Sequence, residues 1–568
     1  MPTIKDWGKG LNRDQPPWEL APGFWSDCQN MRFRDGLAER CGGIAQVVVP
    51  TVTPYWMTVY PSGATRYVIF AGTAKVYSYD GTTQTEITRS ITAVSTISSI
   101  SRTSNVTTVT TGSAHGLTTG DTIQVYGGTG GDAVFNTAST TITVTGATTF
   151  TYANVGSNDT GTGLSYTVLL SASALDFTGA QDNKWTGGNF NGVIVANNPV
   201  DGLFYWDQAG TGRLRAFAAT TYKSDVARVF KYYIVQLAKT VSSVKYRHNI
   251  AWSNSAEPGS IPTEFVSTST NDAGEVDLVS DGEMVDCLEW GDNLIVYKRD
   301  VRFTMHYIGG NAVFDFDRTS VYSKDDGLLA ADCVVNTPAG QVFLTSNKDI
   351  RIHKGGESQS IAEGRVRDWL VANMSTTYYA RSFLCVNPTK NEVWICFPAT
   401  GQSAVTKALL WNWTDNAFGE RDLSGVTFAC SGLLPTTISA DSRMILATNA
   451  PKVGLVDSGT TDFGAAYTSM LERTGMDFDN PSWKTLHASM PLFNASTNFT
   501  ASIYHGSSPT QDGTVTYATA QTYTHNTTKR ITAFAYSGPY VAWKMTTTAS
   551  DTPTLRSIRF DINIDGSD

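Results

Sequence analysis

The side chains that most often carry chemistry are sparse in this chain, and their spacing matches no common catalytic or metal-binding motif. No pair of histidines has the HxxxH or HExxH spacing with which a helix presents two imidazoles to one zinc ion. The sequence contains no GxSxG nucleophile elbow, phosphate-binding loop or dinucleotide fingerprint. It therefore predicts a protein that is not an enzyme, with no catalytic residue, no metal site and no cofactor. The seven histidines are His115, His248, His306, His353, His487, His505 and His525.

Three short segments match functional motifs in part. Ser323–Gly327 (SKDDG) imitates the Asp-box turn of sialidase propellers, but it lacks the closing Trp and occurs once, so an ordinary polar turn is favoured. Asp561–Gly566 (DINIDG) matches the opening of a calcium loop without the bidentate Glu that such a loop needs. Its isoleucines alternate as in a strand, so we expect a terminal strand and turn. Asp315 and Asp317 are a carboxylate pair of the kind that flanks a glycosidic bond, but their separation is not visible in the sequence.

Charge and cysteine content exclude further classes. The formal net charge is −9, the pI is about 5.4, and no cluster of Lys and Arg stands out, which argues against a tight nucleic-acid-binding surface. No apolar run approaches the length of a membrane-spanning helix, and the N-terminus has no signal-peptide layout, so we expect synthesis in a cytoplasm. The cysteines sit mostly inside apolar runs without metal-site spacing, which predicts buried free thiols: Cys28, Cys41, Cys287, Cys333, Cys385, Cys396 and Cys430.

The elements that position these side chains are predicted to be strands. The chain has 568 residues, a length that favours about three domains. Only 16% of the residues are charged, 11% are aromatic, and there are 50 glycines, a balance typical of a rigid, turn-rich β protein.

One sequence unit occurs twice between Asp286 and Gly356. Each copy begins with Asp-Cys and an apolar residue, continues through a Gly-led apolar run and an Asp-x-Arg, and closes at Gly-Gly, with both ends recurring after 46 residues. Each copy holds three or four short alternating runs separated by turn residues, which is the length and pattern of one four-stranded propeller blade. One blade cannot bury both of its faces alone, so neighbouring sequence is expected to supply more blades.

Similar strand pairs before and after this repeat predict an all-β fold. We expect a β-propeller of six or seven blades, with a small inserted β domain and a C-terminal β-sandwich. The Thr-, Ser- and Gly-rich insert is expected between strands of one blade. The predicted parts are an extended N-terminal docking segment (1–45), the first propeller strands (46–92), the insert (93–168), the remaining blades (169–460) and the sandwich (461–568).

Two further segments stand out. Ser360–Glu363 reads as a capping box, and Val366, Trp369, Leu370 and Met374 fall on one face of a helix that would brace the outside of a blade. Large aromatic residues are spread without period through the N-terminal segment, which indicates packing against the chain's own propeller or against a neighbour. The candidate assembly contacts there are Trp7, Leu11, Trp18, Phe24, Trp25, Arg32 and Arg40.

The order of these parts resembles the tail nozzle (tail hub) proteins of short-tailed phages (podoviruses), the packaged-DNA stabilization proteins. Asn30-Met31-Arg32, Asp35-Gly36 and Arg40-Cys41-Gly42, entered through Gly10-Leu11-Asn12, are similar to that family's opening Asn-x-Arg, Asp-Gly, Arg-x-Gly segment. In the insert, His115–Ile123 (HGLTTGDTI), with Phe135-Asn136 and Thr148–Thr151, is similar to a small β module that recurs in phage structural proteins. The resemblance covers nearly the whole chain through short motifs in a common order.

The resemblance implies a virion protein in which six copies form a nozzle below the portal and its adaptor ring. The nozzle would retain the packaged double-stranded DNA and conduct it during ejection without binding it specifically, beside tail fibres or tailspikes and a tail needle or plug. An acidic lumen suits this role, because like charge repels the phosphate backbone. If Trp18 and Trp25 pack between subunits, their replacement by Ala would reduce ring assembly and leave monomer folding nearly intact.

Two other functions stay open at this point. A carbohydrate- or receptor-binding propeller of a phage tail predicts measurable glycan binding and commonly a trimer. A glycan hydrolase predicts activity that one carboxylate substitution abolishes, and no such carboxylate stands out in the sequence.

Overall fold

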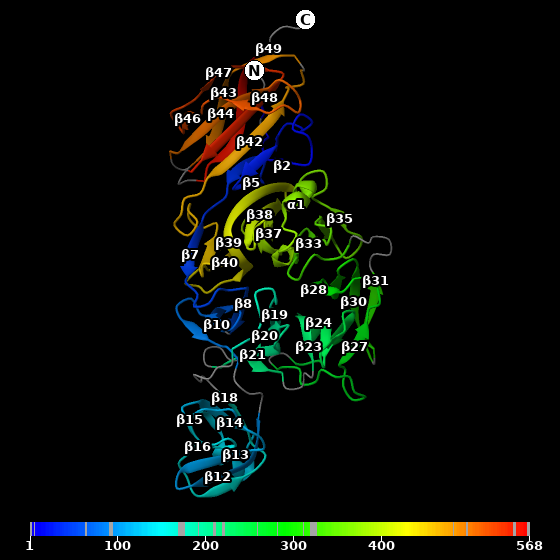
Figure 1. Cartoon of the computed structure of the whole chain (residues 1–568), viewed down its shortest axis with the longest axis vertical. Coiled ribbons are helices and arrows are strands. Elements are labelled where there is room, and N and C mark those ends of the chain that lie inside the picture. Colours follow the sequence, from blue (N-terminus) through cyan, green and yellow to red (C-terminus); the bar gives the residue numbers. More distant parts are fainter. Residues whose placement is uncertain are drawn as a thin grey trace.

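The computed structural model describes residues 3–4, 6–62, 65–89, 95–168, 176–190, 192–207, 212–217, 222–257, 260–280, 282–310, 312–318, 326–480, 482–495, 498–548 and 552–564. The protein is all-β, and its parts follow one another along the long axis of the molecule (Figure 1). The insert lies at one end, a series of sheets lies in the middle, and the C-terminal strands lie at the other end with both chain termini. Ser323–Asp325 of the Asp-box-like turn and Asp565–Gly566 of the calcium-like loop fall outside the described residues.

Apart from the sheet of the insert, five antiparallel sheets follow one another between residues 56 and 360. We call these five sheets, together with the strands from β36 (Phe383–Asn387) to β41 (Val453–Val456) that follow them and β7 (Ile44–Val48), the central sheets. Four of the five have four strands, and the third carries an additional short strand, β25. Their strands are β8 (Trp56–Ser62), β9 (Thr65–Ala71), β10 (Val76–Tyr79) and β11 (Gln84–Glu86); β19 (Thr186–Phe190), β20 (Val193–Asn198), β21 (Gly202–Trp206) and β22 (Arg215–Ala216); β23 (Lys223–Phe230), β24 (Tyr233–Val241), β25 (Val244–Lys245), β26 (Asn249–Trp252) and β27 (Gly274–Asp277); β28 (Met284–Trp290), β29 (Asn293–Lys298), β30 (Arg302–Gly309) and β31 (Val313–Arg318); and β32 (Val334–Thr337), β33 (Gly340–Leu344), β34 (Ile350–His353) and β35 (Gln359–Ser360).

The two copies of the sequence repeat form the fourth and fifth of these sheets, with the strand order that four consecutive antiparallel strands give. Their leading aspartates meet at one arginine of the preceding sheet. Arg228 donates to both carboxylate oxygens of Asp286 at 2.8 Å and to Asp332 at 2.7 Å. The repeat therefore places an equivalent carboxylate of each copy at the same point between neighbouring sheets.

One long strand, β39, joins the last two groups of central strands. β39 pairs with β38 through its first half and with β40 through its second half, and its register shifts beside Gly425. Gly425 has φ +64°, a conformation that glycine adopts at little cost, so the strand bends there from one group of strands to the next. β7, from the start of the chain, pairs with β41. These strands are β36 (Phe383–Asn387), β37 (Glu392–Phe397), β38 (Val405–Asn412), β39 (Ala417–Leu433), β40 (Ser442–Thr448), β41 (Val453–Val456) and β7 (Ile44–Val48).

The leading strands of successive central sheets lie beside one another. β8 contacts β19, β19 contacts β23, β23 contacts β28, β28 contacts β32, and β32 contacts β36. β39 contacts both β36 and β8, so the succession returns to the strand with which it began.

The N-terminal segment, residues 6–43, runs between the central sheets and the strands from Ser469 onward (Figure 1). β5 and β6 form a hairpin whose turn, Asp35-Gly36, has φ of +53° and +73°, as a type I′ turn requires. β5 pairs with β39, β6 pairs with β49, and β4 pairs with β42, so the segment is hydrogen-bonded to both regions. Its strands are β2 (Gly10–Leu11), β3 (Phe24–Trp25), β4 (Asp27–Gln29), β5 (Met31–Arg34) and β6 (Leu37–Arg40), preceded by β1 (Thr3–Ile4).

The C-terminal strands divide between two sheets, which we call the C-terminal sheets. Leu471 and Trp543 on one of them share a hydrophobic cluster with Leu486 and Phe560 on the other, so the core of this region lies between the two. The first sheet contains β42 (Ser469–Met476), β48 (Tyr540–Thr547), β44 (Thr500–Ser508), β45 (Thr516–Tyr517) and β46 (Gln521–Thr524). The second contains β43 (Lys484–Asn494), β47 (Ile531–Gly538) and β49 (Thr554–Ile564), and it continues through β6 and β5 into β39 of the central strands, so these strands form one 13-stranded sheet.

The insert forms a seven-stranded sheet whose pairing of β12 with β13 closes it on itself, around its own apolar cluster. It follows the four complete strands β8–β11, so it stands between two sheets. The expectation that it interrupts one blade between its strands is wrong. Its elements are β12 (Ser95–Thr103), β13 (Val106–Thr111), β14 (Thr122–Tyr126), the 3-10 helix η1 (Gly130–Phe135), β15 (Thr137–Gly146), β16 (Thr149–Ala153), β17 (Asp159–Gly161) and β18 (Ser165–Val168).

The single α-helix among the described residues, α1 (Arg367–Asn373), begins later than the capping-box pattern predicts. The Ser360 hydroxyl does accept a hydrogen bond from the Glu363 amide at 3.0 Å, but it closes a turn that precedes the helix. The predicted apolar face is correct, because Val366, Leu370 and Met374 are buried. A 3-10 helix, η2 (Tyr379–Arg381), follows.

Candidate functional site

The groups tested for catalysis do not assemble into an active site in the described part of the chain. His306 contacts Asp317 at 3.0 Å and Asn293 at 2.9 Å on a partly exposed strand, and Asp315 faces it across the sheet, with no nucleophile bonded to the imidazole. Among the described residues, no three His, Cys, Asp or Glu side chains form a group able to hold a metal ion. No helix there is long and apolar enough to span a membrane.

One serine–histidine pair does have hydrogen-bonding geometry, and it is buried. The Ser489 hydroxyl lies 2.7 Å from Nε2 of His505 and accepts a bond from the Trp543 indole at 3.2 Å. Both members are at most 1% exposed, and burial lowers the pKa of His505 to about 4. A substrate has no access to this hydroxyl, so the three side chains form a neutral polar contact inside the C-terminal sheets.

The cysteines are free, and six of the seven are buried, as their positions in apolar runs predict. Burial raises the pKa of the Cys41 thiol to about 11, and the other thiols shift in the same direction. A thiol must ionise to act as a nucleophile or metal ligand, so these cysteines serve as small apolar side chains.

The seven predicted assembly contacts divide into two groups. Trp7, Leu11, Trp25, Arg32 and Arg40 are fully buried within the single chain. They have no surface to offer a neighbouring subunit, and this corrects their assignment as contacts between subunits. Trp18 and Phe24 keep part of their surface exposed and remain candidates.

The buried tryptophans hold the N-terminal segment against the C-terminal sheets. The rings of Trp7 and Trp25 have centroids 4.5 Å apart, and the Trp25 indole donates to the Trp7 carbonyl at 3.0 Å. Trp25 also packs on Trp543 of β48, with centroids 5.9 Å apart. These aromatics are core residues of the place where the N-terminal segment joins the central sheets to the C-terminal sheets, which we call the junction.

Arg32 connects three elements through buried charge. Its guanidinium donates to both carboxylate oxygens of Asp457, at 2.7 and 3.0 Å, and lies 3.4 Å from Glu392 of β37. Burial alone would raise the pKa of Asp457, but the Arg32 charge and hydrogen bonds outweigh it and hold that pKa low. For Glu392 burial prevails and raises the pKa to about 7.

Arg40 stacks on an aromatic ring together with a second arginine. The guanidinium carbons of Arg40 and Arg421 each lie 4.0 Å from the ring centroid of Tyr467, whose hydroxyl donates to the Cys41 carbonyl. Arg421 also pairs with Asp462, which balances part of the positive charge. The stack joins β6 and β39 to the stretch that leads into the C-terminal sheets.

The remaining motif residues of the N-terminal segment meet the same junction. The Asn30 amide donates to the Thr468 carbonyl at 2.7 Å, and its oxygen accepts from Arg421 at 2.9 Å. A side chain on Gly42 would lie 2.9 Å from the Cα of Asp457, so glycine permits the close approach. No local pattern predicts the partners of these residues, because the partners lie more than 350 positions later in the chain.

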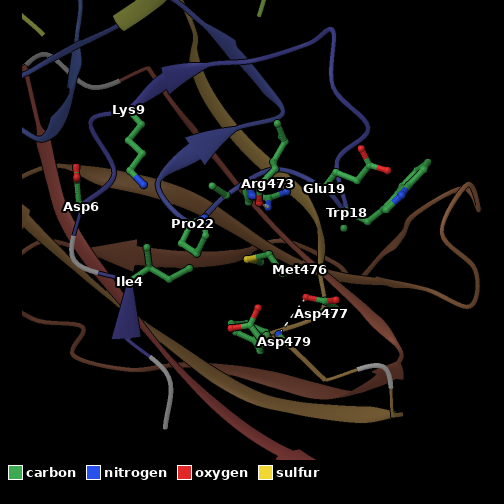
Figure 2. A pocket seen from close by; sticks show the side chains of 14 residues that line it. Ile4, Asp6, Lys9, Trp18, Glu19, Pro22, Arg473, Met476, Asp477 and Asp479 are labelled. Carbon is green, nitrogen blue, oxygen red and sulfur yellow. Dashed lines mark hydrogen bonds between the residues drawn. The ribbon is translucent and has the colours of Figure 1, made fainter. Parts of the chain in front are cut away.

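A cleft of about 690 Å³ opens beside this junction, between the N-terminal segment and the C-terminal sheets (Figure 2). Trp18 and Glu19 lie on one side of it, Asp6 and Lys9 on the other, and Asp477 and Asp479 below. Trp18, one of the two predicted contacts that keep exposed surface, therefore lines this cleft.

The comparisons with known proteins identify no family. No model of a known protein family and no curated protein matches the chain. Among solved structures, it is similar to PorZ, a surface component of the type-IX secretion system of Porphyromonas gingivalis, at 9% identity and a TM-score of 0.29, over 71% of this chain and 44% of that chain. It is similar to Hsv2 of Kluyvelomyces marxianus at 10% identity and a TM-score of 0.28, over 49% of this chain and 72% of that chain. The chain thus spans less than half the length of PorZ, and likenesses this weak carry no argument about function.

Proposed function

We propose that the protein is a structural component of a short-tailed phage tail, the nozzle or tail hub, and that it has no enzymatic activity. Six copies form a ring below the portal and adaptor ring, and packaged DNA leaves through the lumen. Tail fibres or tailspikes and a needle or plug are the further partners. The rivals are a glycan- or receptor-binding tail protein and a glycan hydrolase.

The observation that carries this proposal is the common location of the motif residues on which the family resemblance rests. Asn30 and Arg40 bond or stack with residues of the stretch that leads into the C-terminal sheets, Arg32 binds the N-terminal segment to the central sheets, and Asp35-Gly36 forms the turn of the hairpin that pairs with both. A tube wall that retains DNA under pressure needs its layers locked together. Residues that lock the central sheets to the C-terminal sheets suit that requirement.

The same proposal includes a seven-bladed propeller with an inserted β domain and a C-terminal sandwich. Five blades correspond to the sheets that begin with β8, β19, β23, β28 and β32. The sixth is β36–β38 with the first half of β39, and the seventh is the second half of β39 with β40, β41 and β7. The contact of β39 with β8 supports closure of the propeller into a ring of blades. The pairing of β7 with β41 would hold the seventh blade to the start of the chain.

The electrostatics support passage of DNA without binding. The formal net charge of each chain is −9, and a ring of such chains presents like charge to the phosphate backbone. The absence of an assembled active site among the described residues favours the structural function over the hydrolase.

The test is the solution mass of the purified protein, with negative-stain class averages of the same sample. The expected result is a sixfold ring with a central hole, formed either by the protein alone or after mixing with a portal–adaptor complex. A monomer or trimer that does not bind the portal–adaptor complex and does bind glycans on an array would overturn the proposal in favour of the receptor-binding alternative. Hydrolysis of a glycan would favour the enzyme.

A further inference from the structure

One buried arginine in the lining of the cleft, Arg473, holds the N-terminal segment in place (Figure 2). The Arg473 guanidinium donates to the carbonyls of Pro17, Leu20 and Thr474, and no carboxylate among the described residues pairs with it. Burial lowers its pKa to about 10. Three backbone carbonyls occupy this guanidinium, and the charge of Asp477 at the cleft partly offsets the effect of burial on its pKa.

Close backbone packing completes the wall. Gly475 has φ +69°, and a side chain there would lie 2.7 Å from the Pro17 carbonyl carbon and the Trp18 amide nitrogen. The chain around Trp18 therefore rests directly on the end of β42. This contact positions the partly exposed indole of Trp18 at the rim of the cleft.

The cleft combines an apolar floor with an acidic rim. Leu20 and Met476 are each 4% exposed, and Ile4, Pro22 and Phe478 extend the apolar lining. The rim carries four carboxylates, none of which forms an ion pair with a described residue: Asp6, Glu19, Asp477 and Asp479. Lys9 is the one cation of the lining that is not held by backbone carbonyls.

We infer that this cleft binds an extended segment of another protein that carries Lys or Arg beside an apolar anchor. The carboxylates would pair with the cations, and the anchor would lie on the floor against Trp18 and Met476. The volume falls within the range of about 300–1,000 Å³ that is typical of ligand sites, which is enough for a few side chains. Nucleic acid does not fit, because the rim would repel its phosphates.

The inference goes beyond the proposed function and does not depend on ring formation. The nozzle proposal concerns six copies and DNA, whereas the cleft concerns a single chain and a cationic polypeptide. Failure of one therefore leaves the test of the other unchanged.

The experiment selects ligands from a displayed library of random peptides against the full chain, and measures the affinity of a selected synthetic peptide by fluorescence anisotropy. We expect enrichment of peptides with Lys or Arg beside a large apolar residue, and binding that weakens as salt is raised. The variant Glu19→Gln/Asp477→Asn/Asp479→Asn is expected to bind roughly tenfold or more weakly. Asn at 477 keeps the acceptor that Asp477 offers to the Asp479 amide, so the loop should hold its shape.

The matched control removes three exposed carboxylates elsewhere, in the variant Glu357→Gln/Asp441→Asn/Asp512→Asn. It should bind the peptide as the unmodified chain does. Equal losses in the two variants would mean non-specific charge attraction and would overturn the inference. So would enrichment of peptides without cations, or no enrichment. A change of self-association in the cleft variant, measured by sedimentation, would identify a second copy of this chain as the occupant and would also overturn it.

Discussion

At the scale of single residues, buried arginines connect the elements of the fold. Arg32 holds two carboxylates, Arg40 and Arg421 hold one aromatic ring between them, and Arg473 holds three carbonyls. The guanidinium is planar, stays charged when buried and presents several donors in a fixed geometry, so one side chain can connect several elements. Lysine, with a compact point charge, does not offer this geometry.

Trp18 and Trp25 of the N-terminal segment should respond differently to truncation. Trp25→Ala is expected to lower the free energy of unfolding by about 3–5 kcal/mol, because a fully buried indole and its contact with Trp543 are lost. Trp18→Ala should change it by less than about 1 kcal/mol, because that side chain lies at the rim of a cleft. Urea unfolding of both variants measures the difference. Equal losses would contradict the placement of these residues.

Glu392 should make the stability depend on pH. Its folded pKa of about 7 lies above the ordinary value of 4.5, so the folded state binds this proton more tightly than the unfolded chain. The contribution is complete below about pH 4.5 and is lost as the pH rises through about 7. Glu392→Gln removes it, so the stability of the variant relative to the unmodified protein should rise by about 1–3 kcal/mol from pH 5 to pH 8.

Denaturant unfolding across that pH range provides the measurement for Glu392. The exposed Glu363, replaced by Gln, is the control and should show no such trend. A relative stability of Glu392→Gln that stays constant or falls with pH would show that the buried carboxylate is ionised throughout.

At the scale of elements, the N-terminal segment behaves as an internal connector. It supplies β5 and β6 between β39 and β49, β4 beside β42, and, just beyond it, β7 beside β41. Each of these pairings joins the start of the chain to strands more than 370 residues later. The segment therefore completes the sheets on both sides of the junction.

The close contact at Gly475 tests this connection. Gly475→Ala adds a Cβ atom 2.7 Å from the backbone at Pro17 and Trp18, at a φ of +69° that alanine disfavours. We expect a loss of about 1–3 kcal/mol in unfolding free energy, and faster amide hydrogen exchange in residues 10–25. Gly356→Ala, where a Cβ would meet no atom within 4 Å, is the matched control. Unchanged exchange in residues 10–25 would contradict the docked arrangement.

At the scale of the whole molecule, the regions differ in how much they depend on one another. The central sheets and the C-terminal sheets share the N-terminal segment, and one hydrophobic cluster extends from Val342 in the former to Phe560 in the latter. The insert has its own cluster, which includes Val109, Ile123 and Phe150, and its strands pair only with one another.

Residues 95–168 should therefore fold when produced alone. A closed sheet leaves few unpaired edges, and its apolar cluster needs no residue from the rest of the chain. We expect a β-type circular dichroism spectrum and one cooperative thermal transition. The same fragment with Phe150→Ala, which removes a fully buried ring, should lose about 3–5 kcal/mol of stability. A fragment without a cooperative transition would mean that the insert needs the rest of the chain.

Local sequence patterns predict the strand content, the two sheets of the Asp286–Gly356 repeat, the separate insert and the buried thiols. These follow from local properties, because alternation, turn residues and composition act within a few positions of one another. The capping pattern predicts the start of α1 too early, because Ser360 belongs to β35. The pairing of β35 with β34 overrides the local capping pattern.

The contacts between polar residues follow from how the sheets pack together. Arg32 is 425 residues from Asp457, and Arg473 is 453 residues from the Leu20 carbonyl that it holds. Nothing in the spacing of a single sequence encodes such pairs, because they form when separate sheets pack together. For the same reason Trp25 lies in the core and Trp18 lies at the rim of a cleft, although no periodic pattern around either residue predicts the difference. Burial is set by what the rest of the chain places over a side chain.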